Sequence, residues 1–169
     1  MLSPVLARKA ERRARWAPPE RTRLVKGSHI VVPKLFDHDY AYLFQNADGR
    51  VLFAIPYERD FTLLGTTDVE LKEISGRVRV TAEEISYICQ AVSEYFLRPV
   101  TPEAVVWSFS GVRPLYDDAA GNVSKVTRDY HLQLDTSAAP VVSVFGGKIT
   151  TYRRLAESAM EKIAPHCEG

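Results

Sequence analysis

The chain has 169 residues, of which 46% are hydrophobic and 25% are charged, the composition of a globular protein long enough to bury one sizeable core. Its 22 Lys and Arg nearly balance its 21 Asp and Glu, so the overall charge gives no argument for nucleic acid or an acidic polymer as a partner. The two cysteines offer neither a disulfide framework nor a metal-binding spacing. No apolar run approaches the roughly 20 residues of a membrane-spanning helix. We therefore expect a soluble, cytoplasmic protein.

The N-terminal segment is locally basic. Residues 1–26 hold eight Lys and Arg against only Glu11 and Glu20, and they carry little apolar surface. Residues 1–22 are therefore expected to form a solvated, partly disordered arm, with a nucleic-acid-binding or membrane-binding arm as the alternative. The folded domain is expected at residues 23–166, followed by a short tail at 167–169.

The stretch after this arm predicts an antiparallel sheet. Apolar runs rich in β-branched and aromatic residues, bounded by turn residues, indicate strands. These runs lie at residues 29–33, 40–45, 50–56, 61–66, 104–110, 123–134 and 140–145. The Asn-Ala-Asp-Gly sequence at residues 46–49 is typical of a hairpin turn. The predicted fold class is α+β, with a mainly antiparallel sheet packed with helices.

Two helices are predicted, each with its own signal. Thr81 and Glu84 form a capping box, which places a helix start at Thr81, and an apolar stripe then continues to Leu97 before Pro99. A second stripe with helical spacing covers residues 148–164, directly after two glycines at 146 and 147.

The junction between the two glycines and the second helix is a candidate anion site. The first turn of a helix leaves amide donors unsatisfied and carries partial positive charge. Lys148, Thr150 and Thr151 add a cation and two hydroxyls at the same end, so a phosphate or an anionic ring oxygen could be held there. The alternative is a simple reversal of the chain, for which a Gly-Gly turn is common.

Two arginines are further candidates. Arg113 follows an apolar strand and precedes Pro114, which is expected to stop the strand. A guanidinium at a strand end can hold phosphate or carboxylate in a bidentate manner, although pairing with Asp117 or Asp118 would explain it equally well. Arg128 has Asp129 as its neighbour, so a structural ion pair is its default interpretation.

His29 has the most suggestive setting of the four histidines, because it stands at the start of an apolar strand after Gly27 and Ser28. A histidine in this position is usually a structural residue. Its neutral imidazole could also accept a proton from a hydroxyl group, which is the role that oxidation of an alcohol requires.

Five segments resemble one known family in sequence and in order. They are residues 26–33 (KGSHIVVP), 65–68 (GTTD), 110–115 (SGVRPL), 127–130 (TRDY) and 144–153 (VFGGKITTYR). Together they resemble the aerobic, FAD-dependent glycerol-3-phosphate dehydrogenases, and the second and fifth are also similar to segments of the wider D-amino-acid-oxidase-like flavoproteins.

The resemblance implies a two-domain enzyme in which one domain holds FAD and a sheet-and-helix domain covers the flavin and builds the substrate pocket. This chain is similar to the second domain. The implied reaction oxidises sn-glycerol 3-phosphate to dihydroxyacetone phosphate, with hydride passing to the flavin and the electrons then passing to quinone. A peripheral association with the inner membrane and a homo-oligomer are compatible with this family.

The resemblance also implies roles for individual residues. His29 and Arg113 would be catalytic, with His29 as the general base. Substrate would be bound by Arg113, Arg128 and Lys148, with the arginine that takes the phosphate left open. The edge of the flavin ring would be faced by Gly147, Lys148, Ile149 and Thr150.

One feature of the family is absent from this sequence. The chain contains no GxGxxG, the fingerprint that places a pyrophosphate on a helix N-terminus. We therefore expect FAD to be bound by a complete enzyme and not by this chain alone, which is expected to be inactive by itself. Two alternatives stay open: a stand-alone module that binds an anion or a partner, and a fragment of an amino-acid-oxidase-like flavoenzyme.

Overall fold

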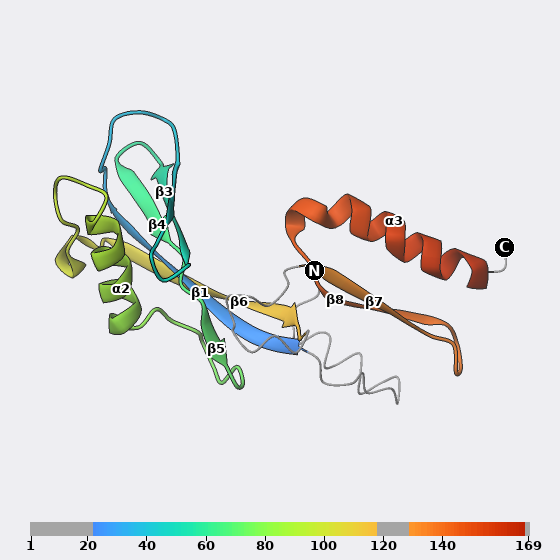
Figure 1. Cartoon of the computed structure of the whole chain (residues 1–169). Helices are drawn as coiled ribbons and strands as arrows, with labels where there is room; N and C mark the ends of the chain where they lie inside the picture. Colours follow the sequence, from blue (N-terminus) through green and yellow to red (C-terminus); the bar gives the residue numbers. More distant parts are fainter. Residues whose placement is uncertain (1–21, 118–128, 168–169) are drawn as a thin grey trace. The chain divides into compact units, whose positions relative to one another are not determined.

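The computed structural model describes residues 22–117 and 129–167, and the chain divides into two compact units. The first, here called the sheet unit, is Val25–Arg113, and the second, the hairpin unit, contains the described residues on either side of it. Figure 1 shows the elements of both units. The sequence did not indicate this division. The boundaries predicted for the arm, the domain and the tail lie at or beyond the edges of the described residues and stay a prediction.

The sheet unit is built on a six-stranded sheet. Its strands are β1 (Thr22–Pro33), β2 (Tyr42–Gln45), β3 (Val51–Tyr57), β4 (Phe61–Gly65), β5 (Val69–Leu71) and β6 (Trp107–Tyr116). The ends of β1 and β6 at residues 22–24 and 114–116 belong to the hairpin unit. Their order is β2-β3-β4-β1-β5, and β6 also pairs with β1. The β2–β3, β3–β4 and β1–β4 pairs are antiparallel. The prediction of an α+β fold with a mainly antiparallel sheet is confirmed.

The hairpin between β2 and β3 turns where the sequence predicted. Gly49 adopts a φ of 80°, which a residue with a side chain rarely adopts. Its N–H donates to the carbonyl of Asn46 at 2.9 Å, and the Asn46 N–H donates to the carbonyl of Arg50 at 2.9 Å. The left-handed glycine thus closes the turn and sets the register of the hairpin.

Helix α2 (Ala82–Ser93) covers one face of this sheet (Figure 1). Ala54, Leu64 and Ile30 form a row across β3, β4 and β1, because Leu64 is the register partner of both others. These three side chains pack with Ile88 and Val92 of α2 in the buried core. Residues paired across antiparallel strands point to the same face, so the neighbouring row faces away from α2.

The two ends of α2 are set by hydrogen bonds. The predicted capping box is present: the Thr81 hydroxyl accepts from the Glu84 N–H at 3.3 Å, and the Glu84 carboxylate accepts from the Thr81 N–H at 2.9 Å. The helix ends at Ser93 rather than at Leu97. The Ser93 hydroxyl donates to the carbonyl of Cys89 and accepts from the N–H of Val100, which turns the chain toward the short 3-10 helix at Pro102–Ala104.

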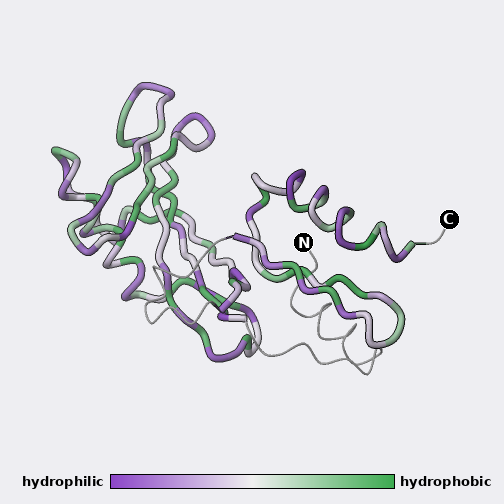
Figure 2. The backbone as a smooth tube through the Cα atoms, turned by 45° about the vertical axis from the view of Figure 1, so that its right-hand side comes forward, coloured by the Kyte–Doolittle hydropathy of each residue, from purple (hydrophilic) through white to green (hydrophobic). Residues whose placement is uncertain are grey.

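The hairpin unit contains the antiparallel strands β7 (Tyr130–Asp135) and β8 (Val141–Gly146), followed by α3 (Tyr152–Ile163). Hydrophobic and hydrophilic segments alternate along α3 (Figure 2), as its predicted stripe requires. Short 3-10 helices flank it at Ile149–Thr151 and Ala164–His166. Residues 123–128 of the strand predicted at 123–134 lie outside the described residues. Within residues 22–117 and 129–167, no helix is long and apolar enough to cross a membrane.

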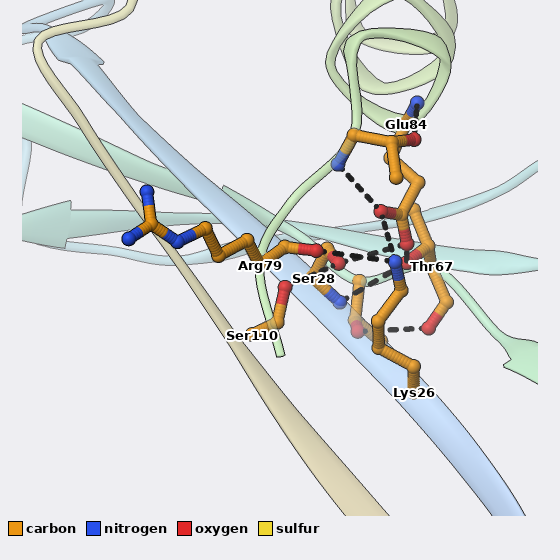
Figure 3. A network of polar contacts seen from close by, with 8 residues as sticks. Lys26, Ser28, Thr67, Arg79, Glu84 and Ser110 are labelled. Carbon is orange, nitrogen blue, oxygen red and sulfur yellow. Dashed lines mark hydrogen bonds and ion pairs between the residues drawn. The ribbon is translucent and has the colours of Figure 1, made fainter. Parts of the chain in front are cut away.

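A buried ionic network joins α2 to β1. The Lys26 ammonium lies 2.7 Å from the Glu84 carboxylate, and only 7% of each side chain is exposed. The same carboxylate accepts from the hydroxyls of Ser28 and Thr67, each at 2.8 Å, and Lys26 also donates to the carbonyl of Arg79 (Figure 3). Lys26 and Ser28 interrupt the apolar pattern of β1, so the sequence predicted a strand start only at His29. Both side chains are buried and bound to Glu84, which allows β1 to begin at Thr22.

Glu84 stays ionised in this environment. Burial raises the pKa of its carboxyl, but the hydrogen bonds from Lys26, from the Thr81 N–H and from the two hydroxyls outweigh burial and leave the pKa below its ordinary value. An ionised carboxylate is the partner that a buried ammonium needs, because an uncompensated buried charge is strongly destabilising.

Glu84→Gln should therefore destabilise the chain. The amide keeps the size of the side chain but leaves Lys26 buried without a counterion, so we expect the free energy of unfolding to fall by about 3–5 kcal/mol. Urea denaturation at pH 7 measures it. Glu83→Gln is the matched control, because Glu83 lies in the same first turn of α2 with an exposed side chain. A loss from Glu84→Gln no larger than from the control would contradict the role of the network.

The stabilisation should also depend on pH. The pKa of Glu84 is lower in the folded chain than its ordinary value of 4.5, so its contribution is present above pH 4.5 and is lost as the pH falls through the folded-state pKa. The difference in unfolding free energy between wild type and Glu84→Gln should accordingly be largest near pH 7 and shrink below pH 4.5. A difference that stays constant over this range would show that the charge of Glu84 is not what stabilises the fold.

Candidate functional site

The face of the sheet that points away from α2 presents an aromatic strip. Phe53, Gly65 and His29 form a row across β3, β4 and β1. The imidazole of His29 stacks on Phe109 of β6, with ring centroids 4.9 Å apart and an interplanar angle of 9°. Trp107 lies beside Phe109 at 5.2 Å between centroids. Phe53, Trp107 and Phe109 remain partly exposed, so this face is open to a ligand or to another segment of protein.

Gly65 makes room for the imidazole. A Cβ at this position would collide with the ring of His29, so the absence of a side chain in the middle of the row lets the histidine lie flat across the strand. The sequence analysis quoted Gly65 only as part of a motif. Its steric role depends on the pairing of β1 with β4, which a single strand does not show.

The surroundings of His29 favour the neutral form of its imidazole. Burial lowers the pKa of its imidazole, and the positive charge of Arg113 lowers it further. Among the described residues no hydrogen-bond partner is found for its buried Nδ1 atom. A neutral imidazole beside a cation can accept a proton from a hydroxyl whose oxygen the cation polarises. The structure thus brings together the two residues predicted to be catalytic, although their catalytic roles stay a prediction.

Arg113 lies within a strand and not at the end of one, which corrects the sequence analysis. Strand β6 continues through Pro114 to Tyr116. A proline ends a strand when its missing N–H is needed by a neighbour, but β6 pairs only with β1 among the strands of the described sheet, and an edge strand tolerates proline. Residues of β6 therefore precede and follow the arginine in sequence, which fixes its backbone.

The guanidinium of Arg113 is anchored by the segment after β4. Its Nη1 atom lies 3.1 Å from Oδ1 of Asp68, and its Nη2 atom donates to Oγ1 of Thr66 at 3.1 Å. The arginine side chain is 31% exposed and the aspartate 14% exposed. Sequence reasoning weighed Asp117 and Asp118 as partners because they are near in the chain; the long-range partner Asp68 was missed, although its Gly-Thr-Thr-Asp motif had been singled out.

The Gly-Gly-Lys segment lies in the hairpin unit. Gly146 and Gly147 have φ values of 69° and 93°, in the left-handed region. The segment does not lead directly into an α-helix as predicted: Ile149–Thr151 is a 3-10 turn, and α3 begins at Tyr152. The N–H and hydroxyl of Thr151 both donate to the carbonyl of Lys148, which closes this turn in place of the first turn of an α-helix.

Most residues of this segment that are predicted to contact substrate and flavin are accessible. Lys148, Ile149 and Thr150 are exposed, so their backbone and side chains could reach the edge of a ring. The chain has no GxGxxG to hold the other end of FAD, so the residues present fit the ring edge only. Arg128, the remaining predicted substrate ligand, lies outside the described residues.

A family model for FAD-dependent oxidoreductases matches residues 3–153. The chain belongs to this family. It is 44% identical over 153 residues to the aerobic glycerol-3-phosphate dehydrogenase of Escherichia coli, with 89% of this chain and 30% of that protein covered. It is 53% identical over 142 residues to the D-erythritol 1-phosphate dehydrogenase of Brucella abortus, with 83% and 28% covered.

A solved structure supports the same relationship. The glycerol-3-phosphate dehydrogenase of Bacillus halodurans complexed with FAD has a TM-score of 0.65 and 32% identity to this chain, over 85% of this chain and 27% of that one. The resemblance inferred from the five sequence motifs is thereby confirmed. The chain spans about 30% of the length of the curated relatives it matches.

Gly146→Ala should destabilise the hairpin unit. The left-handed φ of Gly146 is one reason, and a steric clash of the added methyl group is a second. A Cβ at Gly146 would lie 2.8 Å from the carbonyl oxygen of Asp129 and 3.3 Å from the N atom of Tyr116, whereas a Cβ at Gly76, which has a similar φ of 76°, would meet nothing within 4 Å. We expect faster amide hydrogen exchange in β7 and β8 for Gly146→Ala, and unchanged exchange there for Gly76→Ala. Equal, wild-type exchange in both variants would rule out the close approach at Gly146.

Proposed function

We propose that this chain supplies the substrate-binding part of an FAD-dependent dehydrogenase that oxidises sn-glycerol 3-phosphate to dihydroxyacetone phosphate. The observation that carries the proposal is the placement of His29 on the open face of the sheet within the field of Arg113, where burial and that positive charge lower the pKa of the imidazole. Relatives named glycerol-3-phosphate dehydrogenases support it. Oxidation of a secondary alcohol needs a base for the hydroxyl proton and a cation for the oxygen, and these two residues provide both.

His29 and Arg113 have different proposed roles in this reaction. His29 accepts the proton of the substrate hydroxyl, because its lowered pKa keeps the imidazole unprotonated near neutral pH. Arg113 donates to the oxygen as negative charge develops on it, or holds the phosphate, with Asp68 and Thr66 fixing its guanidinium. FAD, when bound, supplies the hydride acceptor for the carbinol carbon.

Roles are also proposed for the remaining residues that the family resemblance implies. Lys148 and Arg128 would bind the substrate phosphate as further cations. The stretch formed by Gly147, Lys148, Ile149 and Thr150, of which the last three residues are exposed, would contact the flavin ring. The pyrophosphate of FAD would be held by a GxGxxG element that this chain does not contain. By itself, the chain would therefore lack dehydrogenase activity.

A second substrate is favoured by a specific observation. The identity to the D-erythritol 1-phosphate dehydrogenase of Brucella abortus is 53%, above the 44% to the Escherichia coli glycerol-3-phosphate dehydrogenase. Both substrates carry a phosphate monoester and secondary alcohols, and they differ by one carbon with its hydroxyl. A polyol phosphate with a four-carbon chain is therefore the alternative for the same site and the same reaction.

The wider setting follows from the proposed reaction. Quinone is proposed as the final electron acceptor, with the protein in the cytoplasm or peripherally attached to the inner membrane, and a homo-oligomer is compatible with either. The stand-alone anion-binding or partner-binding module and the fragment of an amino-acid-oxidase-like enzyme remain alternatives that direct experiments can separate.

Ligand binding to the chain separates these alternatives. We expect sn-glycerol 3-phosphate and D-erythritol 1-phosphate to shift the NMR signals of His29 and of the Arg113 side chain, while glycerol, which lacks the phosphate, does not. The preferred phosphate ester identifies the substrate. Stronger binding of glycine than of either phosphate ester would favour the amino-acid-oxidase-like alternative. Reduction of added FAD by glycerol 3-phosphate with the chain alone would contradict its proposed inactivity.

Arg113→Ala should lower catalytic efficiency in an FAD-loaded dehydrogenase that contains this chain. Loss of a charge-assisted bidentate contact is worth roughly 1.5–3 kcal/mol, or about a 10- to 150-fold loss in kcat/KM. Arg113→Lys should recover only part of it, because an ammonium keeps the charge but loses the fork. Steady-state kinetics measure both variants. Wild-type efficiency in Arg113→Ala would remove this arginine from the site.

A further inference from the structure

We propose that Gly27, Thr66 and Asp68 form a guanidinium seat, a set of positioning residues that holds Arg113 beside His29. The three residues come from β1 and from the segment after β4, while Arg113 comes from β6. The seat is a property of the folded chain; its importance for substrate oxidation rests on the proposed function. None of the three is proposed to touch the reacting atoms.

The first part of the seat is the pair of acceptors. Asp68 and Thr66 bind different nitrogen atoms of the guanidinium, Nη1 and Nη2, each at 3.1 Å. A planar fork held at both terminal nitrogens cannot turn about the bonds of its side-chain stem without breaking a hydrogen bond. Asp68 is largely buried at 14% exposure, so its bond to Arg113 is less screened than an ion pair on the surface.

The second part is the space left at Gly27. A Cβ at this position would overlap the Arg113 guanidinium, with Nη2, Nη1 and Cζ as the three nearest atoms. The φ of Gly27 is not in the left-handed region, so its backbone would accept any residue. A glycine inside a strand weakens the strand and often marks a close approach of another group. Here the group that approaches is the guanidinium, whose terminal nitrogen atoms come nearest to the glycine.

The buried network holds the seat in place. Thr67, between the two acceptors, donates from its hydroxyl to the Glu84 carboxylate and accepts from the N–H of Ser28. Ser28 in turn stands between Gly27 and His29. The ion pair of Lys26 and Glu84 therefore fixes both sides of the seat, and with them the distance from the guanidinium to the imidazole.

The closing experiment compares two glycine-to-alanine variants of the whole chain. Gly27→Ala places a methyl group where the guanidinium lies, and the flexible end of the arginine can move away without unfolding the strand. Gly111→Ala is the matched control. Gly111 lies two residues before Arg113 in β6, and a Cβ at this position would meet nothing within 4 Å. Arg113→Gln is the reference for loss of the cation. Thr66→Val, which removes one acceptor while keeping the side-chain shape, tests the seat independently if Gly27→Ala fails to fold.

The readouts are the pKa of His29, followed by NMR, and the affinity for inorganic phosphate. The positive charge of Arg113 helps to keep the pKa of His29 below 6.5. We expect this pKa to rise in Gly27→Ala and Thr66→Val, in the same direction as in Arg113→Gln, and to stay at the wild-type value in Gly111→Ala. Phosphate affinity should fall by about tenfold or more in Gly27→Ala and Arg113→Gln.

The outcomes separate the seat from the proposed function. A wild-type pKa of His29 in both Gly27→Ala and Thr66→Val, with a raised pKa in Arg113→Gln, would overturn the seat. An unchanged pKa in Arg113→Gln would show that the guanidinium is not beside His29, and would overturn it as well. If the pKa shifts appear as expected but the wild-type chain binds no phosphate, the seat stands and the anion-binding role of the proposed function fails.

Discussion

The carboxylate of Glu84 is the constraint on which the arrangement of the sheet unit depends. It caps α2 by accepting from the Thr81 N–H, and it is the counterion of the buried Lys26 on β1. It also accepts from two hydroxyls, one on β1 and one on the segment after β4. A buried charge needs every one of its acceptor positions satisfied. The carboxylate therefore orients the start of a helix, a strand and a loop against one another at a single point.

This constraint reaches the candidate site through short stretches of backbone. Ser28 and Thr67 both donate to Glu84. His29 follows Ser28, and Thr66 and Asp68, which bind Arg113, flank Thr67. Alternation along a strand sends adjacent side chains to opposite faces. The polar core thus positions the open face without being part of it, which separates the residues that stabilise the fold from those proposed to meet the substrate.

The open face of the sheet can be compared with the extent of the relatives. The chain spans about 30% of the length of the curated oxidoreductases it matches, and its aromatic strip of Phe53, Trp107 and Phe109 is partly exposed. A sheet with one face packed on a helix and the other open suits a part of an enzyme that closes over a ligand held elsewhere. His29 and Arg113 lie on that face, and their proposed catalytic roles would give it a chemical role beyond packing.

What the sequence determined by itself was local. The sequence predicted the capping box at Thr81 and the hairpin glycine at 49, because both depend on the conformational preferences of residues close together in the chain. It also predicted the fold class and the family resemblance, which depend on short segments and their order. The strand end assigned to Arg113 was wrong because the tolerance of an edge strand for Pro114 depends on which strands lie beside it. The tertiary structure alone decided that Asp68 pairs with Arg113, that Gly27 and Gly65 leave space for other side chains, and that Glu84 binds Lys26 as well as capping its own helix. Each of these depends on contacts between residues tens of positions apart, and only the packing of strands from different parts of the chain brings such residues within hydrogen-bonding distance.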